Sequence, residues 1–151
     1  MKVEEVIKQT KPFKSEFQKL IVNIQVTASW QNSSFALLLK PFGITPHQYN
    51  VLRILRGKFP EGYCNHEITE RMIDKSSNST RIVDKLLEKK LIHRTEDKTD
   101  RRLVDIRINK KGLDLIEKID ATPNPTRTKA KTFNVEKAKL MNEWLNELRE
   151  D

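Results

Sequence analysis

Apolar residues recur along most of the chain at intervals of three and four, and this spacing predicts a mainly helical protein. The first apolar stripe begins after Ser15, which has the capping-box spacing with Gln18, and is interrupted by polar residues at 31–34. It predicts one long amphipathic helix that ends near Pro41 and Gly43. Residues 1–14 have no such period, and we expect them to be loosely ordered.

The second helix carries end signals on both sides. Thr45 and Gln48 have the spacing of a capping box, and Pro46 occupies the first turn between them. Gly57 is placed to adopt the left-handed conformation after the last turn. The inward face of this helix is predicted to consist of Val51, Leu52 and Leu55.

Two shorter helices and a pair of strands follow. Asn65 is expected to cap the third helix, and after a turn at 74–76 the fourth helix runs to about Lys89. Alternating apolar positions predict strands at 91–95 and 103–108. Because two strands of this length are not stable alone, we expect them to pack on the preceding helices. The inward residues of the two helices are predicted to be Ile68, Met72, Ile73, Ile82, Val83, Leu86 and Leu87.

The remaining sequence predicts two more helices, capped by Asn109 and Asn134 and separated by Pro123 and Pro125. The last helix and the first helix carry more apolar surface than a core of this size can cover. We therefore hypothesise a dimer formed by the terminal helices. Its predicted contact residues are Phe17, Ile21, Leu140, Met141, Trp144, Leu145 and Leu148.

Composition limits the class of protein. A chain of 151 residues is expected to form a single domain, residues 1–151, with a core that needs no disulfides. There is one cysteine, and the N-terminus lacks the apolar region of a signal peptide. No apolar run reaches the roughly 18–20 residues that span a bilayer. We therefore expect a cytoplasmic protein, in the reducing cytosol of a microbe.

The net charge of +8 is concentrated in one part of the sequence. Residues 71–111 hold 13 Lys and Arg against 7 Asp and Glu, whereas 120–151 is neutral. A local basic excess attracts polyanions through counterion release, although a solvated basic surface would have the same composition. Here a helix fronted by small polar residues precedes a basic hairpin, and this order suggests double-stranded DNA as the ligand.

Short hydrogen-bonding side chains and one arginine occupy the front of that helix. A helix seated in the major groove reads base edges with the residues near its N-terminus. Arg81 faces outward and could bind guanine O6 and N7, with Asp84 one turn further on to orient it. The alternative is that a serine only caps the helix and Arg81 forms a surface ion pair. The candidate reading residues are Ser76, Ser77, Asn78, Thr80 and Arg81.

Catalytic and metal-binding patterns are absent from the sequence. His47, His66, His93 and Cys64 do not have the spacing of a metal site. No nucleophile motif and no glycine-rich phosphate loop occurs. We therefore expect no metal, no cofactor and no enzymatic activity.

With these elements in place, the sequence resembles a known family. The chain is similar to the multiple-antibiotic-resistance regulator (MarR) family of bacterial transcription factors in ITPHQYNVLRILRG, EITERMIDKSSNSTRIVDKLLEKKLIHRTEDKTDRR and LVDIRINKKGLDLIEKID. The segments KPFKSEFQKLIVNIQVTASW and KPFGITPHQYN resemble members from Bacteroidetes-type bacteria. The similarity covers residues 11–120 strongly and the last helix more weakly.

The resemblance implies a winged helix-turn-helix fold, mainly α with a small β-hairpin, in a symmetric homodimer. The dimerisation helices correspond to 15–43 and 109–151, and the winged helix-turn-helix corresponds to 44–108. Family members commonly repress genes, and many release DNA when a small aromatic or anionic molecule binds. This implies a ligand-responsive repressor on a pseudo-palindromic operator. The alternatives are a winged-helix protein-interaction module and a non-specific architectural DNA binder.

Further site residues follow from the resemblance. The recognition helix corresponds to 77–89 and the wing to 95–102, where Asp100 would order an arginine for a narrow minor groove. The wing candidates are Lys98, Asp100, Arg101 and Arg102, and the phosphate neighbours are Lys75, Lys85, Arg94 and Lys98. The expected effector pocket consists of Trp30, Phe35, Phe42, His47 and Tyr49.

The chain departs from the family pattern at two places. Lys90 stands where relatives have a glycine before the wing strand, so this turn lacks the conformational freedom of glycine. Pro123 and Pro125 lie where relatives continue a helix. The ~34 Å spacing between two recognition helices therefore depends on an altered segment.

Overall fold

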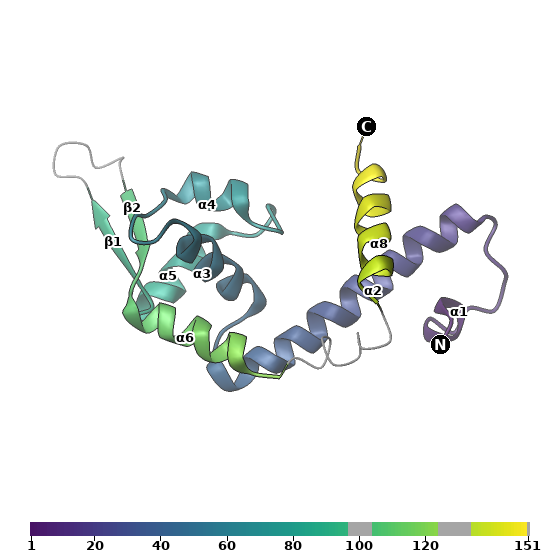
Figure 1. Ribbon diagram of the computed structural model, residues 1–151, viewed down its shortest axis with the longest axis horizontal. Helices are drawn as coiled ribbons and strands as arrows, with labels where there is room; N and C mark the ends of the chain where they lie inside the picture. The colour runs from purple at the N-terminus through teal and green to yellow at the C-terminus, as the bar shows by residue number, and fades with distance from the viewer. Residues whose placement is uncertain (97–103, 124–133, 151) are drawn as a thin grey trace.

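The computed structural model of the chain describes residues 1–96, 104–123 and 134–150. Helices predominate in these residues, and their two strands form one antiparallel hairpin, which confirms the predicted fold class (Figure 1). The elements are α1 (Val3–Val6), α2 (Glu16–Leu39), the 3₁₀ helix η1 (Lys40–Phe42), α3 (Pro46–Lys58), α4 (Asn65–Arg71), α5 (Ser79–Glu88), β1 (Ile92–Glu96), β2 (Val104–Ile108), α6 (Lys110–Ala121) and α8 (Val135–Glu147).

The hydrophobic core lies where α3, α4, α5, α6 and the hairpin meet. Leu52 and Leu55 of α3 and Leu86 of α5 are completely buried in it, which confirms the inward faces predicted for these helices. Ile106 of β2 and Ile116 of α6 complete its centre. Truncating a leucine buried in this way costs about 2–5 kcal/mol. The core therefore fixes α5 firmly against its neighbours.

The hairpin is attached to the rest of the fold through the segment before α4. β1 and β2 pair with Ile92 opposite Ile108, and Tyr63 adds a bridge to Ile106 with hydrogen bonds of 3.1 and 3.0 Å. Gly62 allows this approach because a Cβ at that position would lie 2.4 Å from the Ile106 carbonyl oxygen. The two strands thus sit directly beside the helix-turn-helix.

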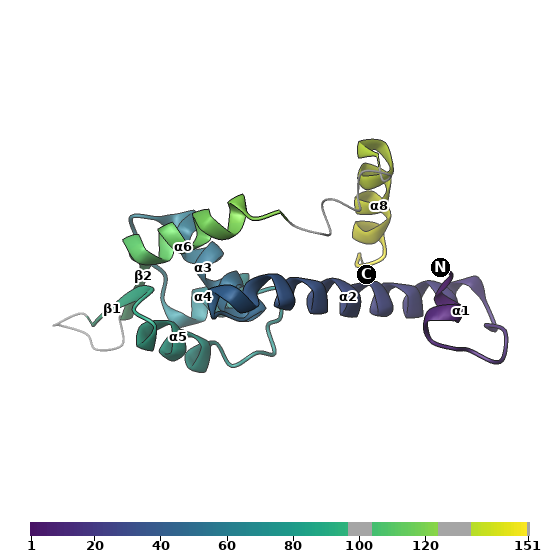
Figure 2. The same ribbon diagram turned by 90° about the horizontal axis from the view of Figure 1, so that it is seen from below.

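The long helix α2 projects well beyond the core, with α1 against its N-terminal half (Figures 1 and 2). The prediction of loose order for residues 1–14 is wrong in this respect. Val3 is buried and Glu4 forms a 2.5 Å ion pair with Lys19 on α2. No helix among the described residues combines the length and apolar character needed to cross a membrane.

Four predicted helix caps are confirmed. The side chains of Ser15, Thr45, Asn109 and Asn134 each accept a hydrogen bond from the backbone N–H three residues further on, at 2.9–3.2 Å. Each of these residues satisfies one of the backbone donors that a helix leaves free at its first turn. The start of α2, α3, α6 and α8 is therefore a local property of the sequence.

Three other local predictions are wrong. Cys64 occupies the N-cap of α4 instead of Asn65, and the Glu67 carboxylate accepts the Cys64 N–H at 2.9 Å. Gly57 lies inside α3, which continues by one residue, and does not have a left-handed conformation. Ile73 is 91% exposed because it follows the end of α4 and cannot extend the apolar face of that helix.

The turn between α5 and β1 is made by Lys90 with a φ of +57°. The Lys90 N–H donates to the Leu87 carbonyl at 2.8 Å, and the Leu91 N–H donates to the Leu86 carbonyl at 3.1 Å. These two bonds form a Schellman motif, in which glycine normally takes the left-handed position. A residue with a side chain pays roughly 1–2 kcal/mol for that conformation.

Candidate nucleic-acid interface

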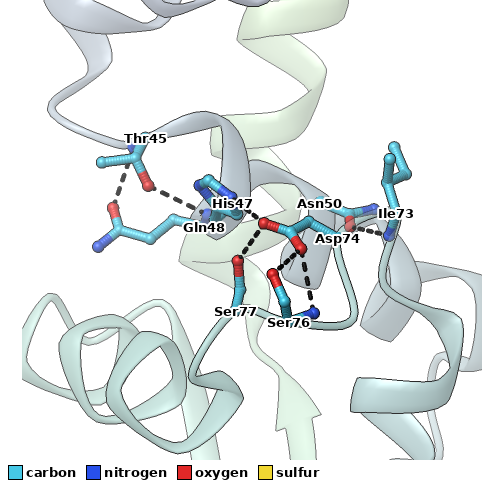
Figure 3. Close-up of polar contacts among 8 residues, drawn as sticks. All are labelled: Thr45, His47, Gln48, Asn50, Ile73, Asp74, Ser76 and Ser77. Atoms are coloured by element: carbon cyan, nitrogen blue, oxygen red, sulfur yellow. Dashed lines mark hydrogen bonds and ion pairs between the residues drawn. The ribbon is translucent and has the colours of Figure 1, made fainter.

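The turn that leads into α5 is organised by one carboxylate, that of Asp74 (Figure 3). Its Oδ1 accepts hydrogen bonds from the Ser76 N–H at 3.0 Å and from the Ser76 hydroxyl at 2.6 Å. Its Oδ2 accepts from the Ser77 hydroxyl at 2.7 Å and lies 3.4 Å from His47 Nε2. The side chains of the turn are therefore positioned before any ligand arrives.

These contacts also set the charge of the turn. The hydrogen bonds that Ser76 and Ser77 donate hold the pKa of Asp74 well below its usual range, so the carboxylate stays ionised. A second tie runs from α3, where Asn50 Oδ1 accepts the Ile73 N–H at 3.0 Å (Figure 3). The turn is thus anchored to α3 by the bond from the Ile73 N–H to the Asn50 side chain and by the His47–Asp74 contact.

The first turn of α5 is capped by Asn78, whose Oδ1 accepts the Arg81 N–H at 3.0 Å. The Asn65 amide of α4 donates to the hydroxyls of Ser79 and Thr80, each at 3.0 Å. Ser79 is buried in this contact, whereas Thr80 remains exposed. The start of the helix at 77 is therefore two residues early, and the cap is Asn78, not a serine as the alternative interpretation of this segment held.

The Arg81 side chain is exposed, and within the described ranges it has no hydrogen-bond or ion-pair partner. The carboxylate of Asp84 was expected to orient it, but that carboxylate lies 3.8 Å from the Arg94 guanidinium instead. Lys85 forms a 2.8 Å ion pair with Glu88. Of the basic candidates on α5, Arg81 alone is thus uncommitted in the part of the chain that the structure describes.

The predicted wing residues Lys98, Asp100, Arg101 and Arg102 lie outside the described residues. The strands on either side of them are described, and β1 packs against α5. Lys75, in the turn before α5, is exposed. Ser76 and Ser77 lie in the turn before α5, Asn78 is the N-cap of that helix, and Thr80 and Arg81 lie in its first turn.

The five residues predicted to line an effector pocket do not gather at one place. Phe35 and Tyr49 pack edge to face, with ring centroids 5.1 Å apart, at the margin of the core. His47 faces Asp74 in the turn before α5. Phe42 lines a cavity together with residues from the end of α5 and from α6, and Trp30 belongs to α2.

The residues predicted for a dimer interface are largely uncovered in the single chain. Phe17 of α2 and Trp144 of α8 are 63% and 61% exposed. The core contains no described residue of α8, and this helix stands apart from α3, α4 and α5 (Figure 2). The other exposed apolar residues of this predicted set are Ile21, Leu140, Met141 and Leu148, while Leu145 is half-buried.

Two carboxylates with clear structural roles were missed at the sequence level. Asp74 was assigned only to a turn, although an aspartate followed by serines two and three residues later is a known signal for this kind of side-chain-to-backbone turn. Asp120 binds Tyr49, Arg53 and Arg56 across 64–71 residues of sequence. No local pattern could have indicated that contact. Among the described residues no group of three His, Cys, Asp or Glu side chains could hold a metal ion.

Comparison with known proteins finds a family that this chain resembles. The MarR family model matches residues 44–104, which contain α3, α4, α5 and β1. No curated protein matches the chain at a significant level.

Solved structures resemble the whole described fold. A MarR transcription factor from Planctomyces limnophilus is 26% identical, with 91% of this chain and 95% of that chain covered and a TM-score of 0.65. CouR from Rhodococcus jostii RHA1 bound to p-coumaroyl-CoA is 21% identical, with 91% and 94% covered and a TM-score of 0.68. BpsR from Bordetella bronchiseptica is 16% identical, with 87% and 99% covered and a TM-score of 0.72. At these lower identities the likeness to CouR and BpsR shows the fold alone.

Proposed function

We propose that this chain, a MarR-family transcriptional regulator, binds a specific site in double-stranded DNA with α5 in the major groove. MarR-family proteins are transcription factors and not enzymes, which agrees with the expectation of no catalytic activity. The observation that carries the proposal is the exposed Arg81 guanidinium on the first turn of α5, uncommitted within the described residues. A guanidinium in that position fits the O6 and N7 acceptors of guanine.

The turn before α5 supports a second mode of base reading. The hydroxyl hydrogens of Ser76 and Ser77 are donated to Asp74. Each hydroxyl then has only lone pairs left for a ligand, so it can accept a hydrogen bond but not donate one. The major-groove groups that donate are the amino groups of adenine and cytosine. We infer that Ser76 and Ser77 recognise such an amino group and that Arg81 recognises a guanine.

We further propose a homodimer on a pseudo-palindromic operator. The uncovered apolar faces of α2 and α8 support it, because burial of such faces is the main driving force of protein association. In this arrangement Lys75, Lys85 and Arg94 lie near phosphates. From their place in the sequence, Lys98, Asp100, Arg101 and Arg102 belong to a wing that enters the minor groove.

The proposal includes repression that a small molecule relieves. The solved relatives include CouR bound to p-coumaroyl-CoA and BpsR, whose DNA binding is regulated by 6-hydroxynicotinic acid. Both ligands combine an aromatic ring with an anionic group. By analogy, an aromatic anion is the effector class that we propose for this chain.

A gel shift with the protein and the intergenic DNA upstream of its own gene, at stated salt concentration, tests the proposal. We expect a shift that excess random DNA does not abolish. Equal competition by random DNA would identify a non-specific architectural binder. No shift on either DNA would favour a protein-interaction module, and both results overturn sequence-specific regulation.

A further inference from the structure

His47 lies against the turn that precedes α5, although it was predicted to line an effector pocket. Its Nε2 atom is 3.4 Å from Asp74 Oδ2, and the ring points toward that carboxylate (Figure 3). Of the three histidines, His47 alone contacts this turn in the part of the chain that the structure describes. The side chains of His47 and Asp74 are 48% and 46% exposed. His47 can therefore exchange protons with solvent beside the proposed base-reading residues.

The Asp74 carboxylate has an acceptor position left for the imidazole. A carboxylate offers about four lone-pair positions, two on each oxygen. The N–H and the hydroxyl of Ser76 fill those on Oδ1, and the Ser77 hydroxyl fills one on Oδ2. The remaining position on Oδ2 faces His47. The imidazole thus completes the set of donors that fixes the orientation of this carboxylate.

The helix that carries His47 is itself firmly placed. Thr45 and Gln48 close a capping box at its first turn, with hydrogen bonds of 3.1 and 3.2 Å, and its apolar side is buried in the core. Asn50 lies three residues after His47, so the two side chains lie on the same side of α3. The Asn50 side chain binds the Ile73 N–H at 3.0 Å. Helix α3 therefore holds the turn at two points, and the one at His47 includes a group that titrates.

Protonation changes the contact between His47 and Asp74. A neutral imidazole has one donor and one acceptor nitrogen, whereas an imidazolium has two donors. A charge-assisted N–H···O bond is about 2.7–2.9 Å long, so the 3.4 Å contact can tighten. Hydrogen bonds from Ser76 and Ser77 lower the pKa of Asp74 and keep it ionised. Near neutral pH the proton that changes this pair is therefore that of the imidazole, since histidine changes charge between about pH 5 and 8.

The charges around His47 leave Asp74 as its partner. Residues 44–52 contain no other charged side chain. Among the described residues, no ion pair or hydrogen bond joins the His47 ring to α2, α4, α5, α6 or β2. Asp120 of α6 binds three other residues of α3 instead. Lys75 follows Asp74 in the turn and Arg81 lies in the first turn of α5, and both are exposed.

We propose that His47 is a positioning residue for the base-reading turn and acts through Asp74. In its protonated form it donates to Oδ2 and holds the carboxylate that keeps the hydroxyls of Ser76 and Ser77 as acceptors. Loss of the proton weakens this hold, and the hydroxyls become free to rotate and donate. The preference for the operator over random DNA is therefore largest in mild acid and falls as the pH rises through the histidine range. This inference rests on the proposed function and adds a residue to it.

Fluorescence anisotropy near pH 6 and near pH 8, at equal ionic strength, tests this role. The probes are the intergenic duplex upstream of the gene and a random duplex of the same length. We expect the ratio of the two affinities to fall roughly two- to fivefold from the lower to the higher pH, the size expected of a half-exposed ion pair. His66→Gln is the matched control, because His66 lies 3.3 Å from Glu70 in a similar surface pair on α4. It should keep the pH dependence of the wild type.

Two substitutions at position 47 separate charge from shape. His47→Lys keeps a positive donor at both pH values, so its ratio should stay at the wild-type level of the lower pH. His47→Gln keeps a neutral donor, and its ratio should stay at the wild-type level of the higher pH. In the Asp74→Ala background, His47→Gln should cause no further change. Asn50→Ala, which loosens the turn without removing a titrating group, should lower the ratio by the same factor at both pH values.

A measurement without DNA separates this inference from the proposed function. The NMR signal of the Ser76 N–H, which is bonded to Asp74, should move between the two pH values in the wild type and in His66→Gln but not in His47→Gln. A moving signal without preference for either duplex sinks the proposed regulator and leaves the hold of His47 on the turn intact. A signal that stays constant in the wild type overturns the inference whatever the DNA result.

Sequence-specific binding with the same affinity ratio at both pH values also overturns the positioning role of His47. An equal gain of affinity on both duplexes at the lower pH is one form of that result. It would identify His47 as a direct phosphate contact, because such a contact does not depend on sequence.

Discussion

The Tyr49 hydroxyl of α3 donates a hydrogen bond of 3.0 Å to the Asp120 carboxylate in the last turn of α6. Arg53 and Arg56 donate to the same carboxylate at 3.0 and 2.9 Å. Burial raises the pKa of Asp120, but the hydrogen bonds from Arg56 and Tyr49 outweigh it and leave that pKa below its usual range. Burial and the bond to Asp120 raise the pKa of Tyr49. This cluster holds the end of α6 on α3, immediately before the segment that leads to α8.

Replacing Asp120 by alanine should destabilise the protein by about 1–2 kcal/mol. The change leaves two arginines and one hydroxyl without their acceptor, and the partial exposure of the cluster reduces the cost below that of a buried pair. Urea unfolding followed by circular dichroism measures the difference. Glu117→Ala removes an equal charge from the exposed face of the same helix and should change stability by less than about 0.5 kcal/mol.

The difference in stability between wild type and Asp120→Ala should depend on pH. Because the pKa of Asp120 is lowered on folding, its contribution to stability is complete above the ordinary carboxyl value of 3.8. The contribution is lost as the pH falls through the lowered value. Wild type and Asp120→Ala should therefore differ at neutral pH and converge in acid. A difference that grows on acidification would contradict the assigned role of the carboxylate.

Replacing Asp74 by alanine should change which bases the turn prefers. Without that acceptor, the hydroxyls of Ser76 and Ser77 can donate as well as accept. We expect a loss of roughly 1–3 kcal/mol in discrimination at the contacted base pair, measured by competition among operator variants. Glu70→Ala removes an equal charge from α4 and should keep the wild-type preference. An unchanged preference in Asp74→Ala would show that the two serines do not read bases through this arrangement.

Replacing Arg81 by alanine should cost about 1–3 kcal/mol at the specific site and relax the preference there. The physical reason is the loss of a bidentate contact to a base edge, which random DNA does not make in the same way. Fluorescence anisotropy on operator and random duplexes measures both affinities. Arg149→Ala, which removes an equal charge after the last helix, is the matched control. Equal weakening of Arg81→Ala on both duplexes would point to a phosphate contact instead.

The two wing arginines, unlike Arg81, are expected to contribute to the affinity for every DNA sequence. Changing Arg101 and Arg102 together to alanine should weaken binding to all duplexes and reduce the dependence of affinity on salt, because fewer counterions are released. If the salt slope stays unchanged, these arginines do not contact DNA.

The parts of the fold that could be predicted from the sequence are those determined by residues a few positions apart in the chain. Thr45, Asn109 and Asn134 begin helices because each side chain satisfies a backbone donor three residues further on, and that spacing is visible in the sequence. Asn65 was misplaced as a cap because its side chain donates to Ser79 and Thr80 of α5, a contact between helices that the sequence does not show. Ile73 was misplaced because α4 ends before it, at Arg71. The pairing of Asp84 with Arg94 and not with Arg81 likewise depends on how β1 lies beside α5.

Replacing Lys90 by glycine should stabilise the protein by about 0.5–1 kcal/mol. Glycine avoids the cost of the left-handed conformation at φ +57°, and part of the gain is offset by the greater freedom of glycine in the unfolded chain. Thermal or urea unfolding measures the effect. The control is Glu88→Gly at the last residue of α5, where the backbone is helical, and it should destabilise by up to about 1 kcal/mol. Loss of stability in Lys90→Gly would mean that the lysine side chain makes a compensating contribution.

Replacing Trp144 by alanine tests whether α8 forms the proposed dimer interface. This side chain is 61% exposed in the single chain and stands in the middle of the apolar stripe of α8. A large aromatic side chain buries roughly 150–250 Å² when covered, so it is a strong candidate for the centre of an interface. We expect sedimentation velocity at micromolar concentration to show a dimer for the wild type and a shift toward monomer for Trp144→Ala. Glu143→Ala, on the polar side of the same helix, should remain dimeric.

The same substitution also connects assembly to DNA binding. A monomer presents one copy of α5, so it loses the paired contact with two half-sites about one helical turn apart. Operator affinity should therefore fall together with dimer content, although Trp144 lies on a helix that is not part of the core around α5. If Trp144→Ala binds the operator as a monomer with wild-type affinity, one copy of α5 is sufficient and the two-half-site arrangement is wrong. If the variant stays dimeric, the interface lies elsewhere than on α8, and the exposed stripe of α2 becomes the next surface to test.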